Sequence, residues 1–253
     1  MLYKYKTLKI LLLALLLPLT VFAQKIDVFI PGFIDEENNK TDFKVKELAI
    51  TRFPMCDSVY KNPYIVATYT YNEHGYLIKE IKNNREGNEV SRIHIAYDSL
   101  NSYAHITQIK SFYYTIELNK FKYDKLGRLR KVTGLVNMTV IKNPILIAYF
   151  YHKKTKECTV SIRINSGPAS KVVVEYNNNN NVVVIKKNKK ITQSAIFDPE
   201  ERLMETRYYD GSFTTSTFYT HDNYKLITES QSYINGVHCF RSRFAYFFYN
   251  RKQ

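Results

Sequence analysis

The stretch Phe121-Lys122-Tyr123-Asp124-Lys125-Leu126-Gly127-Arg128-Leu129-Arg130-Lys131 predicts a tight β-hairpin. Phe121 and Tyr123 are two residues apart, so they share one face of an extended strand. Asp124 and Gly127 fit the first and fourth positions of a type I turn. Gly127 supplies the left-handed residue that closes a three-residue hairpin loop with a bulge.

In this register Tyr123 lies opposite Leu129, and such aromatic–aliphatic pairs contribute about 0.2–1 kcal/mol each. Lys122, Arg128 and Arg130 are expected on the solvent face. The hairpin therefore defines a template, aromatic-x-aromatic-Asp/Asn-x-x-Gly-x-aliphatic.

Imperfect copies of this template recur through most of the chain, with turn-opening positions 21 to 29 residues apart. A period in the twenties indicates stacked supersecondary units, here of about two strands and two turns each. Two copies place His152 and His221 at the Asp/Asn position, where they are interpreted as turn residues. The copies cover residues 69–77, 95–103, 121–129, 149–155, 174–182, 195–203 and 218–226, with a half-copy at 247–250.

The copies assign a structural role to their matching positions, which build the fold and are not an active site. These positions are Tyr69, Tyr71, Asn72, Gly75, Leu77, Tyr97, Asp98, Phe121, Tyr123, Asp124, Gly127, Leu129, Tyr176, Asn177, Phe197, Asp198 and Leu203.

The pattern predicts an all-β fold, in which tandem β-hairpin repeats form a curled, twisted antiparallel sheet or an open barrel-like ribbon. Curling is expected because a flat single-layer sheet would leave its aromatic face in water. The repeat domain is placed at residues 64–253, preceded by strands and loops at 24–63.

Residues 1–23 are typical of a secretory signal peptide. A basic start is followed by an apolar run, Ile10–Leu17, and a break at Pro18. Cleavage is expected between Ala23 and Gln24, and an uncleaved membrane anchor is the competing interpretation. No later stretch is long and apolar enough to span a membrane as a helix. The protein is therefore expected to be exported: periplasmic, outer-membrane-associated or extracellular.

The chain is basic, with a formal net charge of +14, and loss of the three lysines in the signal would leave +11. Such a balance can favour an anionic glycan or another anionic envelope component bound through a basic face. The alternative is that Lys and Arg are the outward residues of alternating strands, which keep the surface soluble. A nucleic-acid partner is not favoured.

The segment Tyr123-Asp124-Lys125-Leu126-Gly127-Arg128-Leu129 resembles the YD repeat of the RHS-repeat family, whose core is Tyr-Asp-x-x-Gly-Arg-Leu. The resemblance extends loosely from Tyr69 to Tyr249. It implies a β-repeat shell or a surface protein that binds carbohydrate, here a short secreted form without a toxin domain. The turns after Tyr209 and Ile234 also resemble MORN-like repeats, and a sheet ribbon of that type is the alternative.

The sequence nominates no catalytic residue, metal ligand or cofactor site, because it lacks the spaced motifs of hydrolases, metalloproteases and phosphate-binding loops. The repeated Tyr and Phe columns are interpreted as core, with a carbohydrate-stacking or nucleic-acid-stacking surface as the alternative. A disulfide between Cys158 and Cys239 is left open.

The hypothesis is thus an exported, non-catalytic repeat protein of a bacterial envelope, acting as a structural or ligand-binding module, with carbohydrate among its candidate ligands. The alternatives are a secreted glycan-active hydrolase and an outer-membrane β-barrel.

Overall fold

Every regular element that the structure describes is a β-strand. The computed structural model describes residues 18–21, 24–27, 45–56, 62–98, 103–110, 114–126, 128–138, 141–152, 157–177, 182–200 and 202–249. Within these residues, no helix has the length and apolar character needed to cross a membrane. Of the predicted cleavage site, Ala23 lies outside the described residues and Gln24 begins the second strand.

The first two strands pair only with each other, and the remaining strands form one sheet. The strands are β1 Pro18–Val21, β2 Gln24–Asp27, β3 Val45–Pro54, β4 Tyr64–Tyr71, β5 Leu77–Asn83, β6 Glu89–Tyr97, β7 Tyr103–Lys110, β8 Tyr114–Tyr123, β9 Leu129–Met138, β10 Ile141–Tyr151, β11 Glu157–Ile164, β12 Ser170–Asn177, β13 Val182–Lys187, β14 Lys190–Phe197, β15 Leu203–Asp210, β16 Phe213–His221, β17 Ile227–Ile234 and β18 Val237–Phe248.

The hydrogen-bonded order of the described strands closes on itself. Strands β3 to β18 follow one another in chain order, and β18 pairs antiparallel with β3, from Phe240 opposite Pro54 to Phe248 opposite Val45. The all-β prediction is confirmed, but the open ribbon is wrong, because the strands form a closed barrel of sixteen. Strand β18, whose end overlaps the C-terminal half-copy, pairs with β3, so neither β3 nor β18 is left as an exposed edge.

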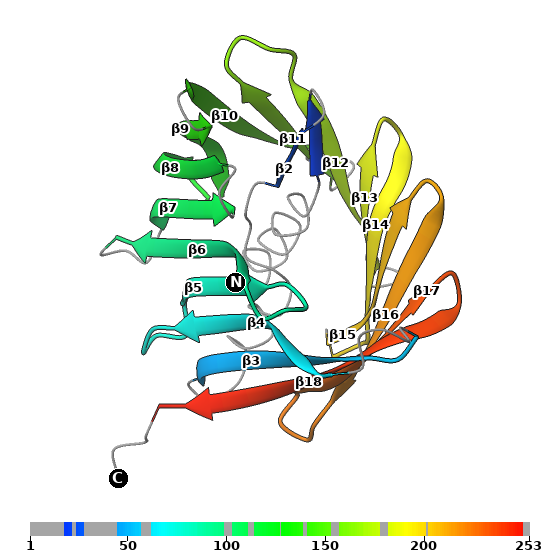
Figure 1. The fold of residues 1–253 in the computed structure, drawn as a ribbon. Coiled ribbons are helices and arrows are strands. Elements are labelled where there is room, and N and C mark those ends of the chain that lie inside the picture. The colour runs from blue at the N-terminus through cyan, green and yellow to red at the C-terminus, as the bar shows by residue number, and fades with distance from the viewer. Residues whose placement is uncertain are drawn as a thin grey trace. The chain divides into compact units, whose positions relative to one another are not determined.

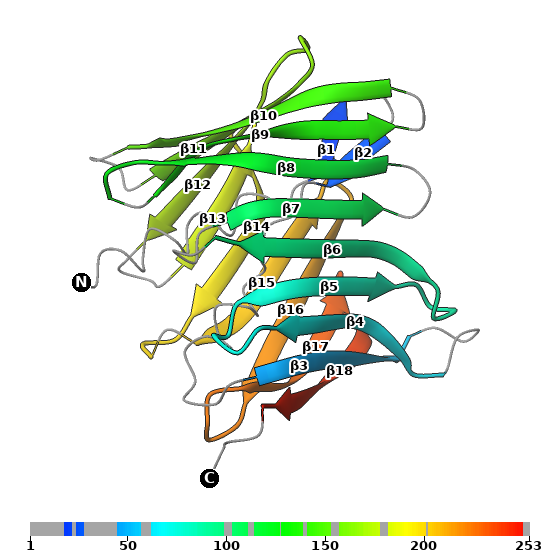
Figure 2. The ribbon, with the colours of Figure 1, turned by 90° about the vertical axis from the view of Figure 1, so that its left-hand side faces the viewer.

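The strands divide into two compact units. The first unit holds β1, β2, β7–β12 and most of β6 and β13, and Figure 2 shows its strands β7 to β10 side by side. The second unit holds β3–β5, β15–β18 and most of β14, and Figure 1 shows β16, β17 and β18 adjacent.

In the first unit one face of the sheet is almost wholly aliphatic and buried. Alternate residues of each strand point to this face, as the period of two requires. Burial of one such side chain stabilises the fold by about 1.5–3 kcal/mol. Its members, each 4% exposed or less, are Ile116, Leu118, Val132, Val136, Ile145, Ile147, Val160, Ile162, Val172, Val174, Val183 and Ile185.

In the second unit the buried face carries hydroxyl groups. Ser230, Ser232 and Ser242 are 5%, 7% and 3% exposed and lie on β17 and β18. Thr217 on β16 contacts Ser232, with 3.0 Å between the two hydroxyl oxygens. Because buried hydroxyls are costly without partners, this hydrogen bond supports the polar part of a face that also buries apolar side chains such as Leu48, Tyr71 and Leu203.

Gly134 marks the closest backbone approach among the glycines of the described sheet. A Cβ on Gly134 would lie 1.8 Å from the carbonyl oxygen of Glu117 on β8. The β8–β9 register shifts between Leu118 and Lys120, so a bulge presses β8 against β9 at this point. Only glycine fits here without displacing the neighbouring strand.

We therefore expect Gly134→Ala to lower the unfolding free energy by about 3 kcal/mol or more, because backbone must shift to admit the methyl group. The control is Gly87→Ala, where φ is +82° but no atom lies within 4 Å. That variant should lose only about 1 kcal/mol. Urea denaturation checks both, and equal losses for the two variants would contradict the close approach.

Candidate functional site

The hairpin turns are held by one recurring contact, which we call the Asx clasp. In the first copy, Oδ1 of Asn72 accepts hydrogen bonds from the backbone N–H groups of His74 and Tyr76, at 3.0 and 2.9 Å. The N–H of Gly75, with φ of 82°, donates to the carbonyl of Asn72. This is the predicted type I turn followed by a left-handed residue.

The clasp recurs in five described turns. In each, the side-chain oxygen of an Asp or Asn accepts from the N–H four residues further on, at 2.8 to 3.0 Å. The residues that form it are Asn72, Asn84, Asp124, Asp198 and Asp222.

The clasp places the aromatic and aliphatic template positions opposite each other. Tyr71 pairs with Leu77, and Tyr123 pairs with Leu129. Phe197 and Leu203 form the equivalent pair between β14 and β15. The predicted cross-strand pairing is therefore confirmed in these three copies.

The template aromatics are not uniformly core residues. Tyr71 and Phe197 are buried, whereas Tyr123 is 37% exposed. Tyr97 lies in a ring contact with Tyr103, whose centroid is 5.4 Å away. The interpretation of the column as core thus holds for some copies only.

The remaining template positions take different places. Tyr69 is half-buried on β4, Phe121 pairs with Val132, and Asp98 directly follows β6. Tyr176 and Asn177 end β12. Gly127 lies outside the described residues.

The seventh copy is shifted by one residue from the prediction. Asp222 forms the clasp, so His221 occupies the aromatic position and pairs with Ile227. Lys225 takes the glycine position with φ of 67°. The turn assignment of His221 was wrong because His221-Asp222 offers two adjacent turn formers, and the carboxylate is the better acceptor for backbone N–H groups. His152 does open its turn, since its N–H donates to the carbonyl of Glu157.

Sequence reasoning missed the clasp at Asn84. This turn is not among the predicted copies, although Asn84 and Gly87 have the template spacing of three. The signal was concealed because no aromatic residue precedes Asn84. The turn is held by the same contacts, with Oδ1 of Asn84 accepting from Glu86 and Asn88.

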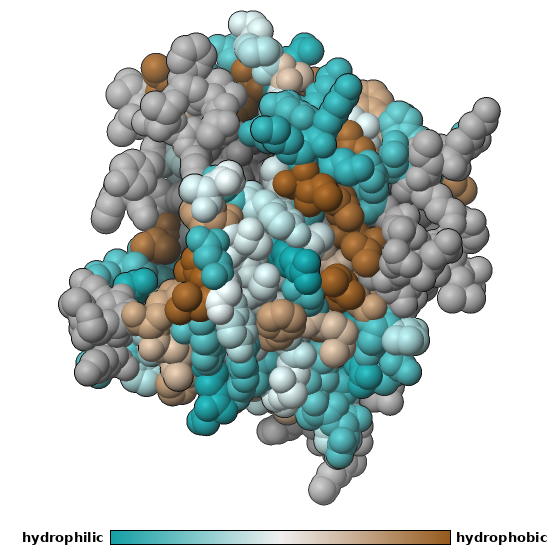
Figure 3. Space-filling model, turned by 90° about the vertical axis from the view of Figure 1, so that its right-hand side faces the viewer, coloured by the Kyte–Doolittle hydropathy of each residue, from teal (hydrophilic) through white to brown (hydrophobic). Residues whose placement is uncertain are grey.

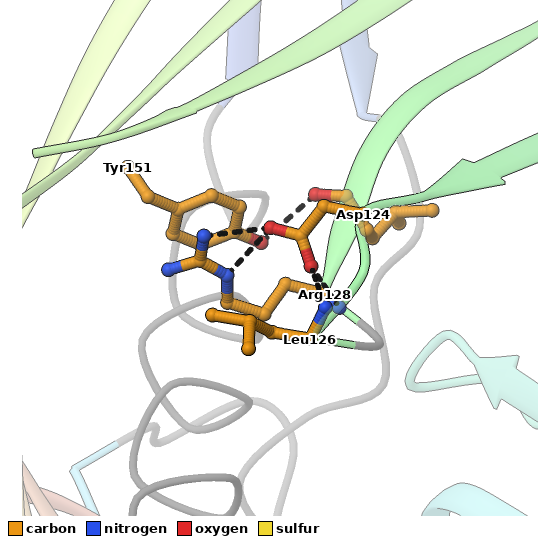
Figure 4. Close-up of polar contacts among 5 residues, drawn as sticks. Asp124, Leu126, Arg128 and Tyr151 are labelled. Atoms are coloured by element: carbon orange, nitrogen blue, oxygen red, sulfur yellow. Dashed lines mark hydrogen bonds and ion pairs between the residues drawn. The ribbon is translucent and has the colours of Figure 1, made fainter.

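Figure 4 shows the turn of the β8–β9 hairpin, in which Arg128 makes a second set of contacts with Asp124. Nε of Arg128 donates to Oδ2 of Asp124 at 2.7 Å. The guanidinium carbon of Arg128 lies 4.5 Å from the ring centroid of Tyr151, whose hydroxyl donates to the carbonyl of Leu129 at 2.9 Å. Arg128 is therefore a partner of the clasp, and not the fully solvated residue predicted from alternation.

Asp198 and Arg202 repeat this arrangement on the β14–β15 hairpin, where Nε of Arg202 donates to Oδ2 of Asp198. Burial opposes the charged form of both carboxylates, but the hydrogen bonds from Arg128 and Arg202 outweigh it and hold the pKa of Asp124 and Asp198 below the usual value. Each pair stabilises the turn in which it lies.

A second polar arrangement lies on the second unit, on the strand face opposite the hydroxyl-bearing one. We call it the outward ladder: Tyr233, Gln231, Glu229 and Arg241. The Tyr233 hydroxyl donates to Oε1 of Gln231 at 3.1 Å. Nε2 of Gln231 donates in turn to Oε1 of Glu229 at 3.5 Å. Arg241 donates to Glu229 at 2.5 Å.

Aromatic rings flank the outward ladder. The rings of Tyr233 and His238 stack with centroids 4.9 Å apart, and Phe218 meets Tyr233 edge-on at 5.8 Å. Figure 3 views the molecule from the side of β14–β17, where hydrophobic patches lie among hydrophilic residues.

The described part of the chain holds no group of three or more His, Cys, Asp or Glu side chains placed to bind a metal. Cys158 and Cys239, for which the sequence leaves a disulfide open, are both buried thiols.

No protein-family model and no curated protein matches the chain. The resemblance to the YD repeat therefore stays a prediction. Among solved structures, a porin-like protein from Bacteroides uniformis aligns with 80% of this chain and 98% of its own, at 11% identity and a TM-score of 0.48. The TcdB2–TccC3–Cdc42 complex aligns with 68% of this chain and 11% of its own, at 11% identity and a TM-score of 0.32.

The depressed pKa values of the two clasp carboxylates predict a pH dependence of stability. A group of this kind contributes fully above its unfolded-state pKa, about 4, and its contribution is lost as the pH falls through the folded-state pKa. We expect Asp124→Asn/Asp198→Asn to lose less stability than the wild type on acidification, because Asn keeps the acceptor oxygen and cannot be protonated.

Urea denaturation at a series of pH values between about 6 and about 3 measures this slope. Glu73→Gln/Asp210→Asn, which removes two carboxylates from exposed positions at or beside turns, is the control for the change in net charge. Identical slopes for the wild type and the double variant would contradict the role of the two carboxylates.

Proposed function

We propose that the chain is an exported β-barrel of a bacterial envelope that acts as a structural or ligand-binding module, with its outward strand face in water. Residues 1–23 would direct export, and the hairpin units would be repeats of the YD type. The observation that best supports an outward strand face in water is the outward ladder.

Within the outward ladder, Gln231 pairs with Arg241 near the middle of β17, where a membrane-embedded barrel would face lipid. Outward charges there cost about 2–4 kcal/mol for Arg or Lys near the bilayer midplane. A similar pair lies on β12 and β13, where Nζ of Lys186 donates to Glu175 at 2.6 Å and the neighbouring residues Val174 and Ile185 point to the buried face. Charged pairs on the outward face together with an aliphatic buried face are the pattern of a protein surrounded by water.

The alternative, an outer-membrane β-barrel, is favoured by the closed order of the described strands and by their even number, sixteen. Closure satisfies every edge, which any sheet in lipid requires. This feature fits the membrane alternative better than it fits the ribbon expected from sequence. Closure, however, satisfies edges equally well in water, and the charge on the outward face supports the water-exposed barrel.

We expect the exported protein to be released from envelopes by carbonate washing and to remain monodisperse without detergent, because its outward charges keep it soluble. An integral porin of the same cells, retained in the pellet, is the control. Retention of the protein with that porin, and release only by detergent, would contradict the proposal and establish the membrane alternative.

A further inference from the structure

The hairpin of β8 and β9 carries a concentration of positive charge that its fold does not need. We call residues 120–131 the basic hairpin. They contain six cationic residues and one carboxylate, Asp124, which is already bound by Arg128. The cationic residues other than Arg128 are all exposed: Lys120, Lys122, Lys125, Arg130 and Lys131.

Two of these lysines are directly opposed. Lys122 on β8 pairs with Lys131 on β9 in the sheet register. Like charges opposite each other on neighbouring strands destabilise the pair. On β10, β11 and β12 the cross-strand row continues with Ala148, Ser161 and Lys171, none of which is a carboxylate.

The clasp does not require this positive charge, because the other clasped turns form without it. Over the twelve positions equivalent to residues 120–131, whose formal net charge is +5, the hairpins that use the same contact have net charges of 0, −1, −3 and −1, at 68–79, 80–91, 194–205 and 218–229. The closest counterpart, at Asp198 and Arg202, encloses Pro199, Glu200 and Glu201 where the basic hairpin has Lys125, Leu126 and Gly127.

Apolar side chains lie among the cations. Leu126 at the tip is 58% exposed, Tyr123 is 37% exposed, and Phe150 on the adjacent β10 is 48% exposed. An anionic glycan would use the lysines and gain nothing from Leu126. A membrane surface would use both, because its phosphates attract the cations and its acyl boundary accepts the apolar tip.

We propose that the basic hairpin docks the protein peripherally on an anionic phospholipid surface. Lys122 and Lys131 lie over the phosphates, and Leu126 enters the headgroup boundary. The proposal rests on the proposed water-exposed face, since a barrel embedded in lipid would have no peripheral dock. The repulsion between the two lysines is the cost of this function, and a lipid phosphate between them relieves it.

The test uses the protein purified after export and sedimented with vesicles. We expect binding to vesicles of phosphatidylglycerol and phosphatidylcholine, release by salt, and little binding to phosphatidylcholine alone. Lys122→Glu should weaken binding about tenfold or more. The same variant should raise the melting temperature, because the introduced carboxylate would then face Lys131 across the strands.

A second variant separates the charge from the fold. Lys125→Pro/Leu126→Glu/Gly127→Glu gives the basic hairpin the turn sequence of its β14–β15 counterpart and should abolish vesicle binding while the clasp persists. Lys46→Glu, which makes the charge change of Lys122→Glu at an exposed residue of β3, is the matched control and should bind as the wild type does. Leu126→Ala should weaken binding in high salt more than in low salt.

Equal binding to charged and neutral vesicles, or undiminished binding by the turn-exchange variant, would overturn the proposal. So would binding to an acidic polysaccharide without binding to vesicles, which would identify a glycan as the partner. These results differ from failure of the proposed function, which appears as retention in carbonate-washed membranes before any vesicle is added.

Discussion

A single side-chain oxygen that accepts two backbone N–H groups is the constraint on which this sheet depends. In the turn of Asp124, Oδ1 binds the N–H groups of Leu126 and Arg128, which no strand partner can reach. The contact fixes the loop at three residues and sets where the bulge falls. Loop length in turn sets the register, and a slip of one residue would reverse the two faces of each strand. In the first unit, the clasp of Asp124 thus holds β8 and β9 in the register that keeps their aliphatic residues on one face, and the other four clasps lie in the second unit.

The clasp was accessible to sequence reasoning because it is local. Asp124 and Gly127 lie three residues apart, and their spacing with flanking aromatics predicts the hairpin, its register and the all-β class. Where the local pattern was ambiguous, as at His221-Asp222, the predicted turn was shifted by one residue. At Asn84, which no aromatic residue precedes, the clasp was not predicted. Closure could not be predicted in this way, because β18 and β3 lie at opposite ends of the repeat array and no residue near either strand specifies its partner. Long-range pairing depends on the accumulated geometry of all intervening hairpins, which no short motif records.

The two strand faces carry different information. The buried face differs between the units, aliphatic in the first and partly hydroxyl-bearing in the second, although a clasp of the same kind occurs in both. The sequence reveals the alternation but not which polar residues join into a network. Tyr233, Gln231, Glu229 and Arg241 come from two strands, and only the antiparallel register of β17 and β18 brings Arg241 to Glu229. Their chemistry as a group is thus a product of the fold, whereas each alone resembles an ordinary surface residue.

The clasp also explains why function can vary from one hairpin to another without loss of structure. Asp124 and Asp198 hold turns with nearly the same contacts, yet one turn is cationic with an exposed leucine and the other is acidic with a proline. Because the contacts use the backbone and one Asp or Asn side chain, the side chains at the first two positions enclosed by the turn can change while the clasp is kept. The charge of a turn can then follow the surface that the turn contacts. An opposed lysine pair, which weakens the sheet, is therefore explained by binding and not by folding. The unequal charge of equivalent turns is therefore a more informative guide to the binding surface than the repeated motif itself, which specifies the architecture.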